Sequence, residues 1–245
     1  MKFKTSWYSE PLGTDVTVTR WGHMGKPFLL FPTAGGDAEE IERFKMIETL
    51  AAPIAEGRIK IYSCDSVAGR TMLAREGSAA HQMYILNAFQ DFVYHEVVPA
   101  IRHDCESQDM EIAIAGSSIG AFNALACICR FPHVFSHAIC MSGTYDLQRF
   151  IDGAPTHDFY TASPVHFIPN LHGQHLEQLQ KRFVLIPSGE GKAEDIQESW
   201  RVAKVLGAKG IPNRVDSWGS EWDHDWPTWR NMLVRYIDEL FPHHS

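Results

Sequence analysis

The pentapeptide Gly116-Ser117-Ser118-Ile119-Gly120 constrains the fold of this chain more than any other feature. Residues 110–115, just before it, are mostly apolar and predict a buried strand, and residues 121–129, just after it, predict a helix. A G-x-S-x-G pattern between a strand and a helix is typical of a tight turn that lifts the serine hydroxyl above a sheet. Only glycine fits at the flanking positions of such a turn. We therefore expect Ser118 to be a nucleophile, with the backbone N–H of Ile119 beside it, rather than part of a glycine-rich turn without chemistry.

Strand and helix patterns alternate along most of the chain. Strands are predicted over residues 15–21, 27–31, 58–64, 110–115, 137–142, 183–187 and 214–218, and helices over residues 41–50, 85–101, 121–129, 196–206 and 229–240. Strand 15–21 alternates polar and apolar residues, as an antiparallel edge strand does, whereas strand 27–31 is continuously apolar, as a strand covered on both faces is. The alternation predicts an α/β fold with a mostly parallel, twisted central sheet flanked by helices on both faces.

A length of 245 residues suits a single domain of this type over residues 1–245. We find no internal repeat, low-complexity tract or linker. The least regular segment is 153–180, which is rich in proline and histidine. It is either a small cap over a pocket or a surface loop.

Composition and charge exclude several classes of protein. The formal net charge of −8 argues against binding to nucleic acid or to an anionic membrane surface. No apolar run is long enough to span a membrane, and residues 1–10 lack the apolar core of a signal peptide. An odd number of cysteines indicates reduced thiols in a cytoplasmic protein, and a homo-oligomer remains open. The cysteines are Cys64, Cys105, Cys127, Cys129 and Cys140.

A serine nucleophile needs a histidine to take its proton and an acid to orient that histidine. In an open α/β sheet these groups gather at the carboxyl ends of strands. His224 lies between the last predicted strand and the closing helix, where a serine–acid–histidine order requires the base. Two other interpretations stay open, in which Asp223 and Asp225 either cap a loop histidine or share a metal with it.

The remaining histidines are less suitable as bases. His133 lies at a predicted helix end, and His137 and His157 do not follow a strand end. His243 and His244 belong to the chain terminus, where we expect fraying.

Four carboxylates compete for the role of the acid. Glu190, Glu194 and Asp195 follow strand 183–187, and Asp146 follows strand 137–142. Glu194 also lies at the start of a predicted helix, where a carboxylate would favour the helix dipole without any catalytic role. Spacing alone does not decide among the four.

The oxyanion formed during acyl transfer needs two preorganised N–H donors. Ile119 supplies one, and the loop at residues 31–36, with its two glycines, is positioned to supply the other. A plain glycine turn is the alternative for this loop. A dinucleotide or phosphate loop is disfavoured, because neither G-x-G-x-x-G nor a P-loop is present.

Four segments together resemble the putative-esterase family of α/β-hydrolases. They are the glycine loop at 32–36, the pentapeptide at 116–120, and the segments 142–146 and 224–229. The family includes S-formylglutathione hydrolase (esterase D), the antigen 85 mycolyltransferases, feruloyl esterases and enterochelin esterases, and the resemblance covers roughly residues 21–241. This chain looks like a single-domain branch of it.

The resemblance implies an α/β-hydrolase fold and a role for each site residue. Ser118 would be the nucleophile, His224 the base, and the N–H groups of Ala34 and Ile119 the oxyanion hole. The family acid follows a glycine by a few residues after the preceding strand, which favours Glu194.

We therefore expect a serine carboxylic-ester hydrolase that forms an acyl-enzyme on a small or medium ester, without a metal or organic cofactor. An acyltransferase using the same residues and a catalytically silent binding protein of this fold are the alternatives. Met72, Tyr145 and Trp222 are candidates for the pocket wall. The sequence does not specify the acyl chain or the alcohol.

Overall fold

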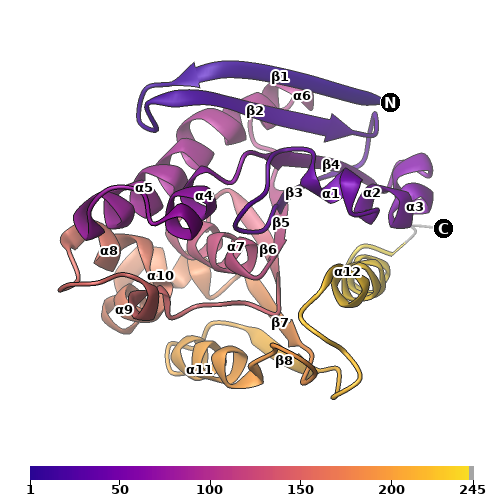
Figure 1. Cartoon of the computed structure of the whole chain (residues 1–245). Coiled ribbons are helices and arrows are strands. Elements are labelled where there is room, and N and C mark those ends of the chain that lie inside the picture. Colours follow the sequence, from indigo (N-terminus) through magenta and orange to yellow (C-terminus); the bar gives the residue numbers. More distant parts are fainter. Residues whose placement is uncertain (243–245) are drawn as a thin grey trace.

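The computed structural model describes residues 1–242, so His243 and His244 lie outside the described residues. Its centre is an eight-stranded sheet in the order β1-β2-β4-β3-β5-β6-β7-β8 (Figure 1). β1 pairs antiparallel with β2, β2 pairs antiparallel with β4, and all other neighbours are parallel. The strands are β1 (Lys2–Ser9), β2 (Thr14–Trp21), β3 (Lys26–Phe31), β4 (Ile59–Cys64), β5 (Ile112–Ser117), β6 (Phe135–Met141), β7 (Phe183–Ser188) and β8 (Asn213–Ser217).

Helices cover both faces of the sheet, as predicted (Figure 1). One face packs against α1, α2 and α12, and the other against α5, α6, α7 and α11. No helix within residues 1–242 is both long and apolar enough to cross a membrane. The helices are α1 (Glu40–Arg43), α2 (Met46–Thr49), α3 (Ala51–Ala55), α4 (Val67–Ala74), α5 (Ala79–Phe92), α6 (Val98–Asp104), α7 (Ile119–Arg130), α8 (His157–Ala162), α9 (Pro164–Phe167), α10 (Gly173–Leu179), α11 (Ile196–Gly207) and α12 (Trp226–Leu240).

The continuously apolar sequence of β3 explains its central place. Phe28 and Leu30 face the layer of α12, while Leu29 and Phe31 face the layer of α5 and α7. All four side chains are at most 2% exposed. Full burial of each contributes about 1.5–3 kcal/mol, so β3 helps join the two cores.

The strand predicted over residues 15–21 is β2, but the prediction that it forms the sheet edge was wrong. β1, which the sequence pattern did not reveal, pairs along its whole length with β2 and takes the edge position. Most of β1 is exposed, and Phe3 is 58% exposed. Without a buried face, its residues carry no clear strand pattern.

Two predicted helices differ in detail from the structure. The helix expected over 41–50 is divided into α1 and α2, because Lys45 adopts a left-handed conformation with φ of 63°. The helix expected over 85–101 runs on to Asp104 through one π-helical segment, Val93–Val97. Most of the predicted apolar side chains still reach the two cores, including Ile41 and Phe89, whereas Phe44 is 44% exposed.

Segment 153–180 folds into short helices that include α8, α9 and α10. α8 is fastened to α5 by two hydrogen bonds, from Asn87 Nδ2 to Asp158 at 3.0 Å and from Gln90 Nε2 to the carbonyl of Ala162 at 2.9 Å. Phe159, a residue of α8, is fully buried. The start of this segment is therefore packed against α5 and does not extend into solvent as an unstructured loop.

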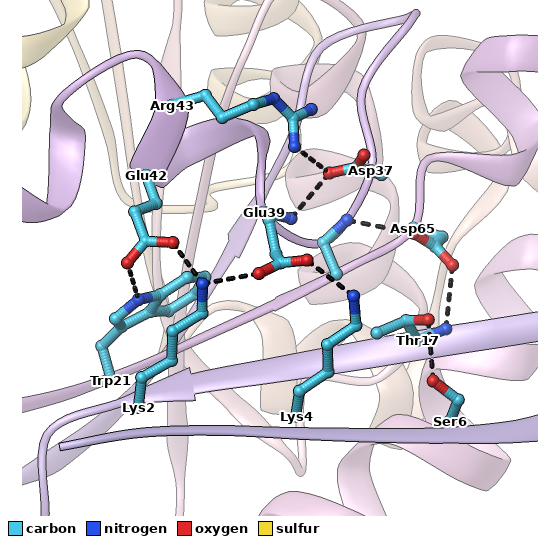
Figure 2. Close-up of polar contacts among 11 residues, drawn as sticks. Lys2, Lys4, Ser6, Thr17, Trp21, Asp37, Glu39, Glu42, Arg43 and Asp65 are labelled. Carbon is cyan, nitrogen blue, oxygen red and sulfur yellow. Dashed lines mark hydrogen bonds and ion pairs between the residues drawn. The ribbon is translucent and has the colours of Figure 1, made fainter.

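Lysines of β1 attach the edge hairpin to the start of α1 (Figure 2). Lys2 forms ion pairs with Glu39 at 2.5 Å and with Glu42, and Lys4 pairs with Glu39 at 2.6 Å. These side chains are partly exposed, so each pair contributes about 0–1 kcal/mol. These ion pairs therefore determine the position of the hairpin more than the stability of the protein.

Candidate active site

Ser118 occupies a strained turn between β5 and α7. Its φ of 58° and ψ of −122° lie outside the regions that non-glycine residues prefer. The chain holds it there through hydrogen bonds from Ser118 N–H to the carbonyl of Met141 and from Ala121 N–H to the carbonyl of Ser118, both 3.1 Å long. Such strain costs about 1–3 kcal/mol and is typical of functional sites.

Two glycines make this turn sterically possible. A Cβ at Gly116 would lie 2.3 Å from the carbonyl group of Gly120, and a Cβ at Gly120 would lie 2.7 Å from the carbonyl oxygen of Pro32. The second contact brings the first turn of α7 against the end of β3. The turn therefore carries Ser118 and also places Ile119 next to the loop that follows β3.

A pocket of about 350 Å³ opens beside Ser118, with Ala34 and Ile119 in the same wall. Within residues 1–242, the backbone N–H groups of Ala34 and Ile119 donate to no acceptor of the protein. Two unpaired donors at the wall that contains the serine hydroxyl are what a developing oxyanion requires. Met72, a candidate for the pocket wall, does line this pocket.

The loop that carries Ala34 is held from both sides by buried carboxylates. Glu40 accepts hydrogen bonds from the backbone N–H of Thr33 at 2.6 Å and from its hydroxyl at 2.8 Å. Asp65 accepts from the N–H of Ala38 at 3.0 Å and from the N–H of Thr17 in β2 at 2.8 Å (Figure 2). The loop is thus preorganised by protein contacts on both sides of Ala34.

His224 lies close to Glu194, with 3.5 Å between its Nδ1 and the Oε2 of the carboxylate. The side chain of Glu194 is only 1% exposed. It also accepts hydrogen bonds from the hydroxyls of Ser142 at 2.6 Å and Ser188 at 3.2 Å. A buried carboxylate with these partners can orient the imidazole and leave its Nε2 free.

The loop between β8 and α12 gives His224 its orientation. The backbone N–H of His224 donates to the carbonyl of Lys192 at 3.0 Å, and its ring packs edge-on against Trp229 with centroids 5.1 Å apart. The neighbouring aspartates have other partners. Asp223 accepts from the N–H of Lys192, and Asp225 caps α12 at the N–H of Trp226. Residues 1–242 hold no cluster of three or more side chains able to bind a metal.

The other three candidate acids have different contacts. Glu190 accepts a hydrogen bond from the hydroxyl of Ser217, and Asp195 caps α11 at the N–H of Gln197 at 3.1 Å. Asp146 lies 3.7 Å from the guanidinium of Arg201. Among the four candidates, Glu194 is the one paired with His224 in the described part of the chain.

The alternative histidines are placed elsewhere. His133 hydrogen-bonds to the hydroxyl of Tyr94 at 3.0 Å, and the His137 ring packs between Phe183 and Phe241. Burial lowers the pKa of both imidazoles. Neither they nor His157, at the start of α8, line the pocket of Ser118.

The structure thus brings the predicted residues together in two groups. Ser118, Ala34 and Ile119 line the pocket, and His224 pairs with Glu194. No hydrogen bond joins Ser118 to His224 within residues 1–242. The loop after β6 connects the groups, since the N–H of Thr144 donates to the carbonyl of Ser118 at 3.4 Å and Ser142 contacts Glu194.

Two candidates for the pocket wall lie outside it. Tyr145 is 1% exposed and its hydroxyl donates to the carbonyl of Cys140 in the core. Trp222 packs edge-on against Trp218. The sequence analysis did not identify Ser142 and Ser188, whose hydroxyls donate to Glu194. Ser142 ends one predicted strand and Ser188 follows another. Polar residues at the carboxyl ends of strands are candidates for a functional site in this class of fold.

Comparisons with known proteins bear on the family and the fold of the chain. The family model described as "Putative esterase" matches residues 56–240. No match was found among curated protein sequences.

Solved structures of similar fold include a ferulic acid esterase, with 16% identity and a TM-score of 0.76 over 98% of each chain. S-formylglutathione hydrolase (FrmB) from Staphylococcus aureus has 15% identity and a TM-score of 0.74, again over 98% of each chain. MPT51 from Mycobacterium tuberculosis has 14% identity and a TM-score of 0.68, covering 97% of this chain and 98% of that one. At these identities the likeness establishes the α/β-hydrolase fold. Because the family model spans most of the sequence, the chain belongs to the putative-esterase family.

Proposed function

We propose that this protein is a serine carboxylic-ester hydrolase that works through an acyl-enzyme. The observation that carries the proposal is the wall of the Ser118 pocket. There a serine in a strained strand-to-helix turn lies with two backbone N–H groups, of Ala34 and Ile119, that have no acceptor in the described protein. The His224–Glu194 pair at the carboxyl ends of β7 and β8 supports it.

In the first step, Ser118 Oγ attacks the carbonyl carbon of the ester while His224 Nε2 takes the hydroxyl proton. The carbonyl oxygen becomes an oxyanion, which the N–H groups of Ala34 and Ile119 stabilise. When the carbon–oxygen bond to the alcohol breaks, His224 returns the proton to the leaving alcohol. The products are the free alcohol and an ester of Ser118.

In the second step, His224 removes a proton from a water molecule that attacks the acyl-enzyme. The same oxyanion hole serves the second tetrahedral intermediate. Collapse returns the proton to Ser118 and releases the carboxylic acid. Glu194 keeps Nδ1 of His224 protonated and turned away from the substrate in both steps.

The pocket supports a small or medium ester as the substrate. Its volume of about 350 Å³ is at the lower end of the range for small-molecule sites, and apolar side chains such as Met72 and Leu147 line it. Ester cleavage is also the activity that the names of a ferulic acid esterase and a thermostable esterase of similar fold share.

A fluorophosphonate probe tests the nucleophile directly. We expect intact-mass spectrometry to show one adduct on the protein and none on Ser118→Ala, with peptide mapping placing it on Ser118. Equal labelling of the variant, or no labelling of the folded protein, would contradict the proposal and favour a silent binding protein.

A series of p-nitrophenyl esters from acetate to palmitate then measures the acyl preference. We expect the short and medium esters to be cleaved fastest. Adding alcohols to the assay separates hydrolysis from acyl transfer, because a transferase would form new esters in preference to the free acid.

A further inference from the structure

Among the described residues, one charged side chain lines the Ser118 pocket. Apolar groups make up most of its wall, including Met72, Leu73, Leu147 and Phe150, and the hydroxyls of Ser118 and Thr144 add polarity without charge. The exception is Arg75. A substrate that fills this pocket therefore meets an apolar surface and one positive charge, carried by an exposed arginine.

The Arg75 guanidinium has no protein partner in the described part of the chain. Within residues 1–242 its side chain forms no hydrogen bond, ion pair or cation–π contact. Most other arginines of this acidic protein form ion pairs, as Arg43 does with Asp37 and Arg214 with Glu239. An arginine left unpaired at a pocket wall, in a chain with a net charge of −8, is available to an anionic ligand.

The backbone of Arg75 has a conformation that is unusual for an arginine. Arg75 ends α4 in a left-handed conformation, with φ of 51° and ψ of 43°. Its N–H donates to the carbonyl of Met72 at 3.2 Å, and the N–H of Glu76 donates to the carbonyl of Thr71 at 3.0 Å, which closes the helix end. Glycine is the residue that usually ends a helix in this way. The cap alone therefore does not explain an arginine at this position.

We propose that Arg75 makes the enzyme selective for esters that carry a carboxylate, separated from the scissile carbonyl by a short apolar chain. This inference rests on the proposed function of the same pocket. The guanidinium can hold a carboxylate through two parallel hydrogen bonds while the apolar wall covers the chain. A single positive charge matches a carboxylate better than a phosphate, which carries about −1.5 to −2 near neutral pH.

A matched pair of esters tests the proposal. Mono-p-nitrophenyl adipate and p-nitrophenyl hexanoate differ in a terminal carboxylate against a terminal methyl group, and both release p-nitrophenolate. The measured quantity is the selectivity, the kcat/KM for the adipate ester divided by that for the hexanoate ester. We expect the wild-type selectivity to exceed that of Arg75→Gln by about tenfold or more, mainly through KM, because a charge-assisted hydrogen bond is lost. Arg75→Lys should retain part of it.

Arg70→Gln is the matched control. Arg70 lies on the same helix and is exposed, but it does not line the pocket. If Arg75 binds the carboxylate, Arg70→Gln keeps the wild-type selectivity. An equal loss in the two variants would indicate general attraction of anions, and an unchanged selectivity in Arg75→Gln would also overturn the proposal. General damage to the pocket slows both esters and leaves their ratio as it was.

The same experiment separates the two levels of inference. If the hexanoate ester is hydrolysed and the fluorophosphonate labels Ser118 while the selectivity does not depend on Arg75, the carboxylate preference is wrong and the esterase activity stands. If neither ester is hydrolysed and Ser118 is not labelled, the esterase proposal fails and the carboxylate preference fails with it.

Discussion

The carboxylate of Glu40 accepts hydrogen bonds from both the backbone N–H and the hydroxyl of Thr33, the residue before Ala34. Glu40 is 6% exposed, and Gly36 provides the space for it, since a Cβ at Gly36 would lie 2.4 Å from Glu40 Oε2. The side chain therefore fixes the part of the loop that precedes Ala34, a residue that lines the Ser118 pocket.

From this contact we expect Glu40→Ala to lower kcat by about 10- to 100-fold with a smaller change in KM. This is less than the loss of about 10²–10³ that follows outright removal of an oxyanion donor. Steady-state kinetics on a p-nitrophenyl ester measures kcat and KM of the variant, and circular dichroism checks that it is folded. Glu39→Gln is the control, because it removes ion pairs with Lys2 and Lys4 and leaves Thr33 untouched. A kcat that is equally reduced in both variants would argue against a specific role of Glu40.

The pairing of His224 with Glu194 predicts which carboxylate matters for turnover. We expect Glu194→Gln to lower kcat by about 10²–10⁴, because the imidazole loses the group that selects its tautomer. Glu190→Gln and Asp146→Asn should stay near the wild-type rate, since those carboxylates bind Ser217 and face Arg201. Collapse of activity in either control, with a nearly normal Glu194→Gln, would reassign the acid.

Ser142 extends this prediction to a residue that supports Glu194. Its hydroxyl donates to the carboxylate at 2.6 Å, and its own φ is 47°. We expect Ser142→Ala to lower kcat by about tenfold or more, the size of one lost hydrogen bond to a charged group. Combining Ser142→Ala with Glu194→Gln should then add little, because the hydroxyl acts through the carboxylate. Fully multiplicative losses in the double variant would show that Ser142 acts independently.

The features that the sequence predicted are those encoded locally. The turn at Ser118 needs only neighbouring residues, and the position of His224 follows from strand order, so both could be read from short segments. The contacts of Glu194 with Ser142 and Ser188 depend on how three strand ends meet, which no single segment encodes. Choosing Glu194 among four carboxylates therefore needed a family resemblance.

Exposed residues and one unusual backbone conformation explain what the sequence did not reveal. β1 has almost no buried side chain, so its strand pattern was missed although it forms the sheet edge. The break between α1 and α2 depends on the left-handed conformation of Lys45, a residue type with no such preference. Arg75 was also missed, because an exposed arginine gains its significance only from the pocket that it lines.

His137 predicts how stability depends on pH. Burial, followed by the positive charge of Lys26, lowers the pKa of its imidazole from the ordinary value of 6.5. The unfolded chain therefore takes up the proton at a higher pH than the folded protein. As pH falls through 6.5 towards the lower folded pKa, the free energy of unfolding should decrease.

The variant His137→Phe tests this, because it keeps a ring between Phe183 and Phe241 and removes the titrating group. Urea unfolding at a series of mildly acidic pH values should show a shallower loss of stability for the variant than for the wild type. Identical slopes would mean that His137 is not the source of the acid sensitivity.

Gly120 and Gly207 are a matched pair for testing the geometry of the turn at Ser118. A Cβ at Gly120 would meet the carbonyl oxygens of Pro32 and Phe31 at 2.7 and 3.0 Å, whereas a Cβ at Gly207, at the end of α11, would meet nothing within 4 Å. We expect Gly120→Ala to lower the free energy of unfolding by about 1–3 kcal/mol through overpacking. It should also slow fluorophosphonate labelling, because α7 must move away from the loop that carries Ala34. Gly207→Ala should leave labelling unchanged and be neutral or stabilising by about 0.5–1 kcal/mol. A Gly120→Ala variant that is labelled at the wild-type rate would show that close approach of α7 to β3 is not needed to position the nucleophile.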